Sequence, residues 1–188
     1  MFNAFDGCEN LTYNATDSPN LSNVTDLSRM FSKCKNFNAT NLNNWDVSSI
    51  RSVTFMFNEA EKFNGDISNW DVSNIIDFRN MFSSARDFNR DISGWTINTS
   101  EPVNMEGMFA GASDFNQPIG NWNISQVTDV GFMFQDALNF NQSLGNWDIS
   151  NVIDMDGMLD NTGLSIDCLL YTSPSPRDQR GSRMPSSA

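Results

Sequence analysis

Apolar and polar residues follow one pattern that recurs about every 25 residues along most of the chain. In one copy the apolar positions are Trp70, Val72, Ile75, Phe78, Met81, Phe82, Ala85, Phe88 and Ile92. The spacing of three and four residues from Phe78 to Ala85 predicts a short helix or 3₁₀ turn. The stretch from the position of Phe88 to the position of Val72 in the following copy alternates loosely and carries β-branched residues, which predicts a short strand.

Two sets of large apolar residues recur at fixed offsets. One set is the tryptophans Trp45, Trp70, Trp95, Trp122 and Trp147. The other set is the pairs Met56-Phe57, Met81-Phe82, Met108-Phe109 and Met133-Phe134. A unit of this size cannot bury its apolar face alone, whereas stacked units bury it in continuous columns. The sequence therefore predicts a repeat solenoid in which these residues form the structural core.

A Phe-Asn pair also recurs once in each unit. Its asparagines are Asn38, Asn64, Asn89, Asn116 and Asn141. We expect a structural ladder of buried amides that bond the loop backbone from one coil to the next. The alternative is a recognition surface for a ligand.

Composition limits the function classes. The chain has 23 acidic and 11 basic residues, a net charge of −12, and no His. This charge argues against nucleic acid as a partner, and no apolar segment approaches the ~20 residues of a membrane span. Without His, acid–base catalysis lacks its commonest group, and Cys8 and Cys34 lack a base. Asp77, Asp129 and Asp154 recur at one offset as a solvated or capping column, so we expect no enzyme and no catalytic residues.

The residues that follow the tryptophans leave a calcium site open as an alternative. Asp46, Asp71 and Asp148 follow their Trp at one offset, with Asn123 in the same place. Stacked carboxylates could share calcium, but the dense spacing of calcium loops is missing, so we expect Asx-type turns and no metal or cofactor.

Cys8 and Cys34 are equivalent in neighbouring units, where later units have Ala. They indicate a column of small core side chains, or a disulfide between coils ~5 Å apart.

The repeat stops near Asp167. From Cys168 the sequence reads Cys-Leu-Leu-Tyr-Thr-Ser-Pro-Ser-Pro-Arg-Asp. This order matches the translation of a transposase-library sequencing adapter, so residues 168–188 are expected to be non-native and disordered. Leaving them out removes three Arg, one Asp and the third Cys, which makes the remainder more acidic.

Particular segments resemble a known repeat family. Asn69–Ser93 and Asn121–Gly145 resemble the 25-residue repeats of BspA-like leucine-rich-repeat surface proteins, a class also seen in mycoplasma-type lipoproteins. Cys8–Phe31 resembles the first repeat of such proteins, and Leu159–Ser165 resembles the start of their C-terminal cap. The resemblance covers about residues 4–166. It implies a leucine-rich-repeat-like solenoid on a secreted or cell-surface bacterial protein for adhesion or protein binding.

These observations divide the chain into four parts: a degenerate N-terminal repeat or cap (1–31), the solenoid (32–159), the truncated start of a C-terminal cap (160–167) and the adapter segment (168–188).

We expect a monomeric, non-enzymatic module that binds an unidentified extracellular protein or glycan. The alternative is a passive spacer in a larger surface protein, and a weaker one is a calcium-stabilised or catalytic acidic surface. Variation between units at exposed positions favours recognition of a ligand over a passive spacer. Allowing for insertion and slip, the position 20 residues after each Trp holds Gly65, Arg90, Pro118 or Ser143, depending on the unit.

Overall fold

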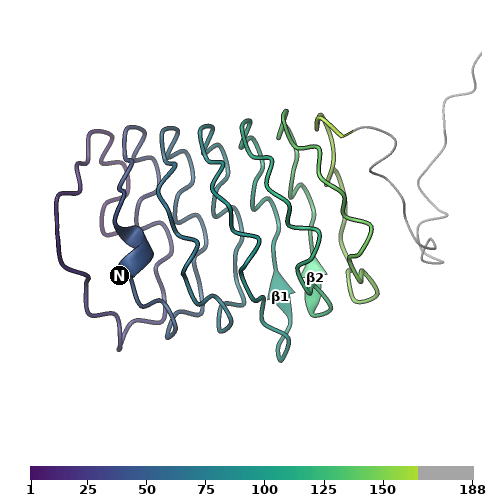
Figure 1. The fold of residues 1–188 in the computed structure, drawn as a ribbon, viewed down its shortest axis with the longest axis horizontal. Helices are drawn as coiled ribbons and strands as arrows, with labels where there is room; N and C mark the ends of the chain where they lie inside the picture. The colour runs from purple at the N-terminus through teal and green to yellow at the C-terminus, as the bar shows by residue number, and fades with distance from the viewer. Residues whose placement is uncertain (165–188) are drawn as a thin grey trace, which may run out of the picture.

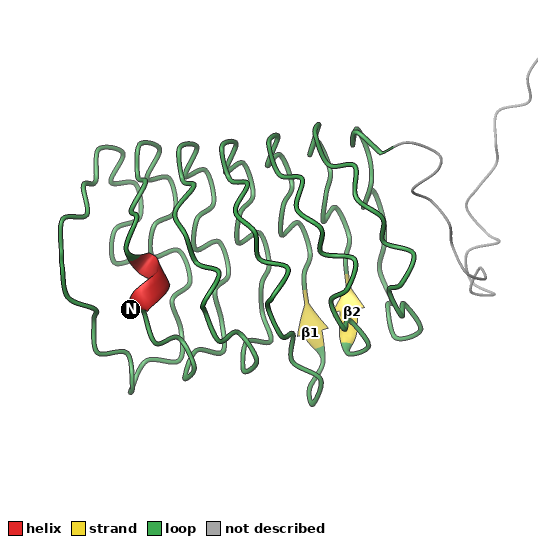
Figure 2. Ribbon diagram, viewed as in Figure 1, coloured by secondary structure: helices red, strands yellow, loops and turns green. Residues whose placement is uncertain are grey.

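The computed structural model describes residues 1–164, so residues 168–188, which we expect to be non-native, lie outside the described residues. Within this range the chain forms a row of similar coils placed side by side (Figure 1). Most of it is turn and extended chain (Figure 2). The elements are the 3₁₀ helix η1 (Leu42–Asn44) and the strands β1 (Val103–Asn104) and β2 (Val127–Asp129).

One line of parallel pairings crosses the coils. Strand β1 pairs with β2 in parallel, with Val103 opposite Val127 and Asn104 opposite Asp129. Isolated parallel bridges continue this line in both directions: Asp26 with Ser52, Ser52 with Asp77, Asp77 with Asn104, and Asp129 with Asp154. Each residue thus pairs with the equivalent residue of the next repeat.

Backbone hydrogen bonds between coils extend well beyond this line. In one coil the N–H groups of four alternate residues donate to carbonyl groups of the coil that follows, over 2.7 to 2.9 Å. These bonds run from Phe78, Asn80, Phe82 and Ser84 to Asn104, Glu106, Met108 and Ala110. The intervening residues Met81, Ser83 and Ala85 donate to the carbonyl three residues earlier. Alternate N–H groups therefore bond within the coil and between coils.

The helix or 3₁₀ turn expected over Phe78–Ala85 is replaced by consecutive reverse turns. Asn80 and Ser84 have φ of 53° and 58°, the left-handed region that a type II turn requires at its third position. A right-handed helix would need negative φ throughout. The strand expected between Phe88 and the Trp segment is likewise absent from the described residues, because β1 and β2 lie just before the Met-Phe pairs instead.

The interior is filled by columns of large side chains. The Met and Phe of the pairs Met56-Phe57, Met81-Phe82, Met108-Phe109 and Met133-Phe134 are fully buried. The rings of Phe57 and Phe63 stack at 3.9 Å within one coil, and Phe57 stacks on Phe82 of the next coil at 5.6 Å. Such offset stacking adds to the burial of apolar area. The core therefore runs the length of the coils without interruption.

The tryptophans form a second inward column. Trp45, Trp70, Trp95, Trp122 and Trp147 are 3 to 8% exposed. Nε1 of Trp70 donates to the Leu42 carbonyl of the preceding coil over 2.8 Å. The next three tryptophans donate over 3.1 Å to Ile67, Ile92 and Ile119. Each buried indole N–H thus has a partner, which avoids the cost of burying an unpaired donor.

Candidate functional site

Five asparagines form a ladder along one edge of the coils. Oδ1 of Asn38 accepts the backbone N–H of Asn64 at 3.1 Å, and the same bond joins Asn64 to Asn89, Asn89 to Asn116, and Asn116 to Asn141. The bonds connect coil to coil as expected, but the amides lie at the surface and are not buried. The reason is that the Phe before each Asn points inward, and successive residues of an extended chain point to opposite sides.

Neighbouring side chains support this ladder. Nε2 of Gln117 donates to the carbonyl and to Oδ1 of Asn89 at 3.0 and 2.7 Å, and Nε2 of Gln142 donates to Oδ1 of Asn116 at 2.8 Å. Oδ1 of Asn38, Asn64, Asn89 and Asn116 thus accepts bonds from the next coil, and these bonds hold adjacent coils in register.

The acidic corners contain Asx-type turns. After four of the five tryptophans, all except Trp95, Oδ1 of the next residue accepts the backbone N–H two residues later over 3.0 to 3.1 Å. The acceptors are Asp46, Asp71, Asn123 and Asp148. Hydrogen bonds from the Ser48 side chain and backbone hold the pKa of Asp46 below its ordinary value. No group of three or more His, Cys, Asp or Glu in residues 1–164 is placed to hold a metal ion.

The Asp77 column caps the backbone in the same way. Oδ1 of Asp77, Asp129 and Asp154 accepts the N–H two residues later, over 2.9 to 3.2 Å. Burial alone would raise the pKa of Asp77, but hydrogen bonds from Arg79 hold the pKa below its ordinary value. The carboxylates of this column are therefore engaged in stabilising turns.

Both cysteines in the repeat region are free thiols. Cys34 is buried and Cys8 is exposed. The Cys34 thiol donates to the Phe5 carbonyl at 3.0 Å, and burial raises its pKa to about 11. The disulfide left open by the sequence is therefore not formed, and Cys34 alone of the two belongs to the buried column that continues with Ala60 and Ala85.

A different surface carries the most varied side chains. Two columns of residues, four positions apart, have φ between 53° and 69° in successive coils. The first column holds Arg29, Phe55, Asn80, Gly107, Phe132 and Gly157, and the second holds Lys33, Glu59, Ser84, Gly111, Asp136 and Asn161. We call these twelve residues the variable face. In neither column do adjacent coils carry the same residue type.

Two phenylalanines on the variable face are unusual for their positions. Phe55 and Phe132 both have φ of 56°, although a left-handed conformation costs a non-glycine residue about 1–2 kcal/mol and is rare for bulky side chains. Phe132 is also 42% exposed. Gly107 and Gly157 show that the same column accepts residues without this strain. Such an outlier on a surface indicates a candidate functional site.

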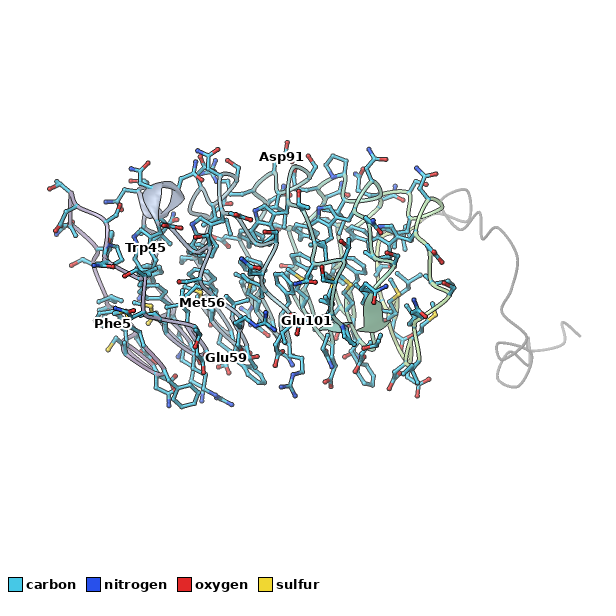
Figure 3. All side chains as sticks on the ribbon, turned by 90° about the horizontal axis from the view of Figure 1, so that it is seen from below. Phe5, Trp45, Met56, Glu59, Asp91 and Glu101 are labelled. Carbon is cyan, nitrogen blue, oxygen red and sulfur yellow. The ribbon has the colours of Figure 1, made fainter. Side chains whose placement is uncertain are left out.

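Side chains on this face lean over the next coil. The Arg29 guanidinium lies 4.5 Å from the ring centroid of Phe55, in a cation–π arrangement. A Cβ at Gly157 would lie 2.7 Å from the Phe132 ring, so the glycine leaves room for the aromatic side chain. Figure 3 shows Glu59 toward the lower edge of the molecule and Asp91 at the upper edge, with Met56 between them. The variable face is therefore separated by the core from the Asp91 edge.

The two-residue insertion between Trp95 and Ser100 makes a local loop. Asn98 is 5% exposed, and its Oδ1 accepts the N–H groups of Ser100 and Glu101 at 2.7 and 3.0 Å. Both oxygens of Glu101 accept from the Arg51 guanidinium, two repeats away, at 2.7 and 2.8 Å. Through this ion pair, the loop that contains the insertion reaches across the intervening coil to the coil of Arg51 on the outside of the molecule.

Sequence reasoning missed the variable face. Of the residues considered from the sequence as one variable position, Arg90, Pro118 and Ser143 are exposed, but Gly65 is buried, where a Cβ would clash with the Ala39 carbonyl. The Asn ladder shows that they are not equivalent, because Gln117 and Gln142 follow their ladder asparagines as Gly65 and Arg90 do. The available signal was the placement of Gly107 at the same offset as Asn80, because Gly and Asn are the residues that tolerate positive φ.

In residues 1–164 no helix is long and apolar enough to cross a membrane. A family model described as "Mycoplasma protein of unknown function, DUF285" matches residues 1–106 and again 96–166. The chain belongs to this family. The two DUF285 matches cover the repeated coils, in agreement with the mycoplasma-type repeats that the sequence resembles. No curated protein and no solved structure gave a significant match to this DUF285 chain.

Proposed function

We propose that this DUF285 chain is a non-enzymatic binding module whose variable face contacts an extracellular protein or glycan. The observation that carries the proposal is the pair Phe55 and Phe132, bulky side chains in left-handed backbone, of which Phe132 is 42% exposed and Phe55 is half-buried. Exposed aromatic and arginine side chains are the groups that most often dominate protein interfaces. Arg29 adds such a group beside Phe55.

A leucine-rich-repeat-like solenoid of the BspA type, secreted or on the cell surface, is the architecture and location that we propose with this function. Support comes from the parallel pairings one repeat apart and from the inward columns of Trp, Met and Phe. A solenoid presents one extended surface in which each coil contributes a similar small area. Binding is therefore expected to be spread over several coils.

The contrast between the inner and outer columns favours binding over a passive spacer. The inner columns keep the same residue types from coil to coil, whereas the variable face changes its type at every step. A spacer needs only the constant core and the Asn ladder, and a strained, exposed phenylalanine such as Phe132 adds nothing to it.

The test is a binding array of glycans and extracellular matrix proteins probed with the full chain. Phe132→Asn is expected to weaken a positive signal about tenfold, as loss of an interface anchor does. Leu138→Asn is the matched control, because Leu138 is 59% exposed and lies outside the variable face. Equal losses for both variants, or no signal above background for the folded chain, would support the spacer. Hydrolysis of an array component that one Asp→Asn change abolishes would support an enzyme.

A further inference from the structure

The first column of the variable face contains nearly the same series of residue types twice. Followed from coil to coil, and starting one coil before the face, the column holds two sets of three: Asn3, Arg29 and Phe55, and then Asn80, Gly107 and Phe132. All six residues have φ between 53° and 60°. The second set repeats the Asn and the Phe of the first, with Gly107 in the place of Arg29.

The second column shows the same replacement. There Lys33 is followed in the next coil by Glu59, and Gly111 is followed by Asp136. One coil therefore presents Arg29 and Lys33 beside a ring and a carboxylate. Three coils later, two glycines occupy the positions of these cations beside another ring and another carboxylate.

The two phenylalanines differ in what covers them. The Arg29 guanidinium lies 4.5 Å from the ring centroid of Phe55, and Phe55 is half-buried. Phe132 follows Gly107 in the column, no cation lies over its ring among residues 1–164, and it is 42% exposed. Because the face of an aromatic ring attracts a cation, Phe132 is open to the kind of group that Phe55 already holds.

The negative charge around Phe132 also lacks a cation of its own. From Asp91 to Leu164 the sequence contains ten acidic residues and no Lys or Arg. Asp136 is exposed, and its Oδ1 accepts a hydrogen bond from the uncharged amide of Asn161 at 2.9 Å. This part of the variable face therefore combines an open aromatic ring with uncompensated carboxylates.

The cations that precede this region in the chain are engaged elsewhere. Arg79 donates to the carboxylate of Asp77 at 2.9 and 2.7 Å. Arg86 and Arg90 donate to acceptors in the coil that precedes their own. None of these bonds is directed toward the coil of Gly107, so a cation for the Phe132 ring would come from another molecule.

We propose that the surface over Gly107 and Gly111, beside Phe132 and Asp136, binds a basic segment of a partner protein. An arginine guanidinium of that segment lies against the Phe132 ring, and a second Lys or Arg lies near Asp136. The inference rests on the proposed binding function and names its partner as a protein, because guanidinium groups stack on aromatic faces and neutral sugars have no cation. Neither glycine has a side chain that would project into the place of the partner's cations.

The test is a nuclear magnetic resonance titration of the full chain with a short Gly/Ser peptide that carries an Arg and a Lys four positions apart, as Arg29 and Lys33 are. The control peptide has Gln at both positions. We expect only the basic peptide to shift the amide signals around Gly107, Gly111 and Phe132, and the shifts to weaken in high salt, which screens exposed charges. Absence of these shifts, or shifts confined to other surfaces, would overturn the proposal.

Single substitutions separate the ring from the charge. Phe132→Leu keeps an apolar side chain but removes the aromatic face, so it is expected to weaken peptide binding about two- to fivefold, as loss of an exposed cation–π contact does. Asp136→Asn keeps an amide oxygen for Asn161 and is expected to weaken binding by a similar factor. Asp91→Asn is the matched control, because it removes the same charge at the edge across the core (Figure 3). Equal losses for the two Asp→Asn variants would indicate non-specific attraction and would contradict the site.

The double variant Gly107→Arg and Gly111→Lys gives the chain its own cations at this place. Asn80 lies where a Cβ at Gly107 would be and has to move, but Asn3 precedes Arg29 in the same column, so the column accepts this order. We expect the double variant to keep its circular dichroism spectrum and to lose peptide binding. Undiminished binding by the folded double variant would contradict the proposal.

The peptide titration and the array test different statements. Array signals from glycans alone, without peptide binding, would overturn the basic partner and leave the proposed binding function in place. Peptide binding that Phe132→Leu and the double variant reduce would support the basic partner, whichever array components give a signal.

Discussion

At the scale of single residues, the structure combines apolar burial with the hydrogen bonding of each polar atom. Trp70 shows both requirements, because its ring is 3% exposed and its Nε1 donates to the Leu42 carbonyl at 2.8 Å. Cys34 shows them too, since its buried thiol donates to the Phe5 carbonyl. Among the buried side-chain polar atoms of the described residues, Ser32 Oγ is the exception without a partner.

Replacing Trp70 by Ala is expected to destabilise the protein by about 3–5 kcal/mol, because the change opens a cavity in a continuous core. Trp70→Phe, which keeps most of the ring volume, is expected to cost less. Urea unfolding of both variants measures the difference. A loss below about 1 kcal/mol for Trp70→Ala would contradict the inward placement of this column, given the usual cost of such cavities.

At the scale of the element, the consecutive turns at Asn80 and Ser84 determine how one coil meets the next. Their positive φ values direct alternate N–H groups toward the following coil. A helix over the same residues would have bonded those N–H groups internally and left no donors for stacking. The turns are therefore what allows adjacent backbones to bond along their whole shared length.

The strain at Phe132 gives a prediction for this element. Phe132→Asn is expected to keep or raise stability, by up to about 1 kcal/mol, because Asn tolerates the left-handed conformation better than an aromatic residue. The reverse change, Asn80→Phe in the same column, is expected to lower stability by a similar amount. Thermal and urea unfolding of both variants provide the measurement, and a large loss for Phe132→Asn would show that its ring is needed for packing.

The sequence could predict the interior better than the backbone. Residues such as Trp70 and Phe82 recur at fixed offsets because every coil must fill the same space, so their burial follows from the repeat alone. The turn at Asn80 could not be predicted in this way, since a spacing of three and four apolar residues is common to helices and to consecutive turns. The variable face escaped prediction for the opposite reason, because it has no constant residue type and is defined only by φ.

At the scale of the whole molecule, stability is expected to be a sum over coils and the contacts between neighbours. Deleting residues 46–70 joins Trp45 to Asp71 and restores the original Trp-Asp-Val-Ser sequence. We expect this variant to fold with one coil fewer and to unfold with a smaller urea m-value, since less surface is exposed on unfolding.

Deleting residues 46–57 is the control for this prediction. It removes about half a repeat, so the inward columns on the two sides of the deletion no longer share a register, and we expect the variant not to fold cooperatively. Circular dichroism and urea unfolding of both deletions provide the comparison. Equal stability of the two deletions would contradict a modular stack of coils.

The direction of the hydrogen bonds between coils has an electrostatic consequence. In one coil four N–H groups, from Phe78 to Ser84, donate toward the C-terminal end, and fewer donate back, such as Ile76 to Arg51 and Asp87 to Glu61. Peptide dipoles that point the same way add, as they do in an α-helix. The row of coils therefore has a net dipole that is positive at the C-terminal end. From Asp91 to Leu164 the sequence contains Asp and Glu but no Lys or Arg, so its anionic half lies where this dipole attracts negative charge.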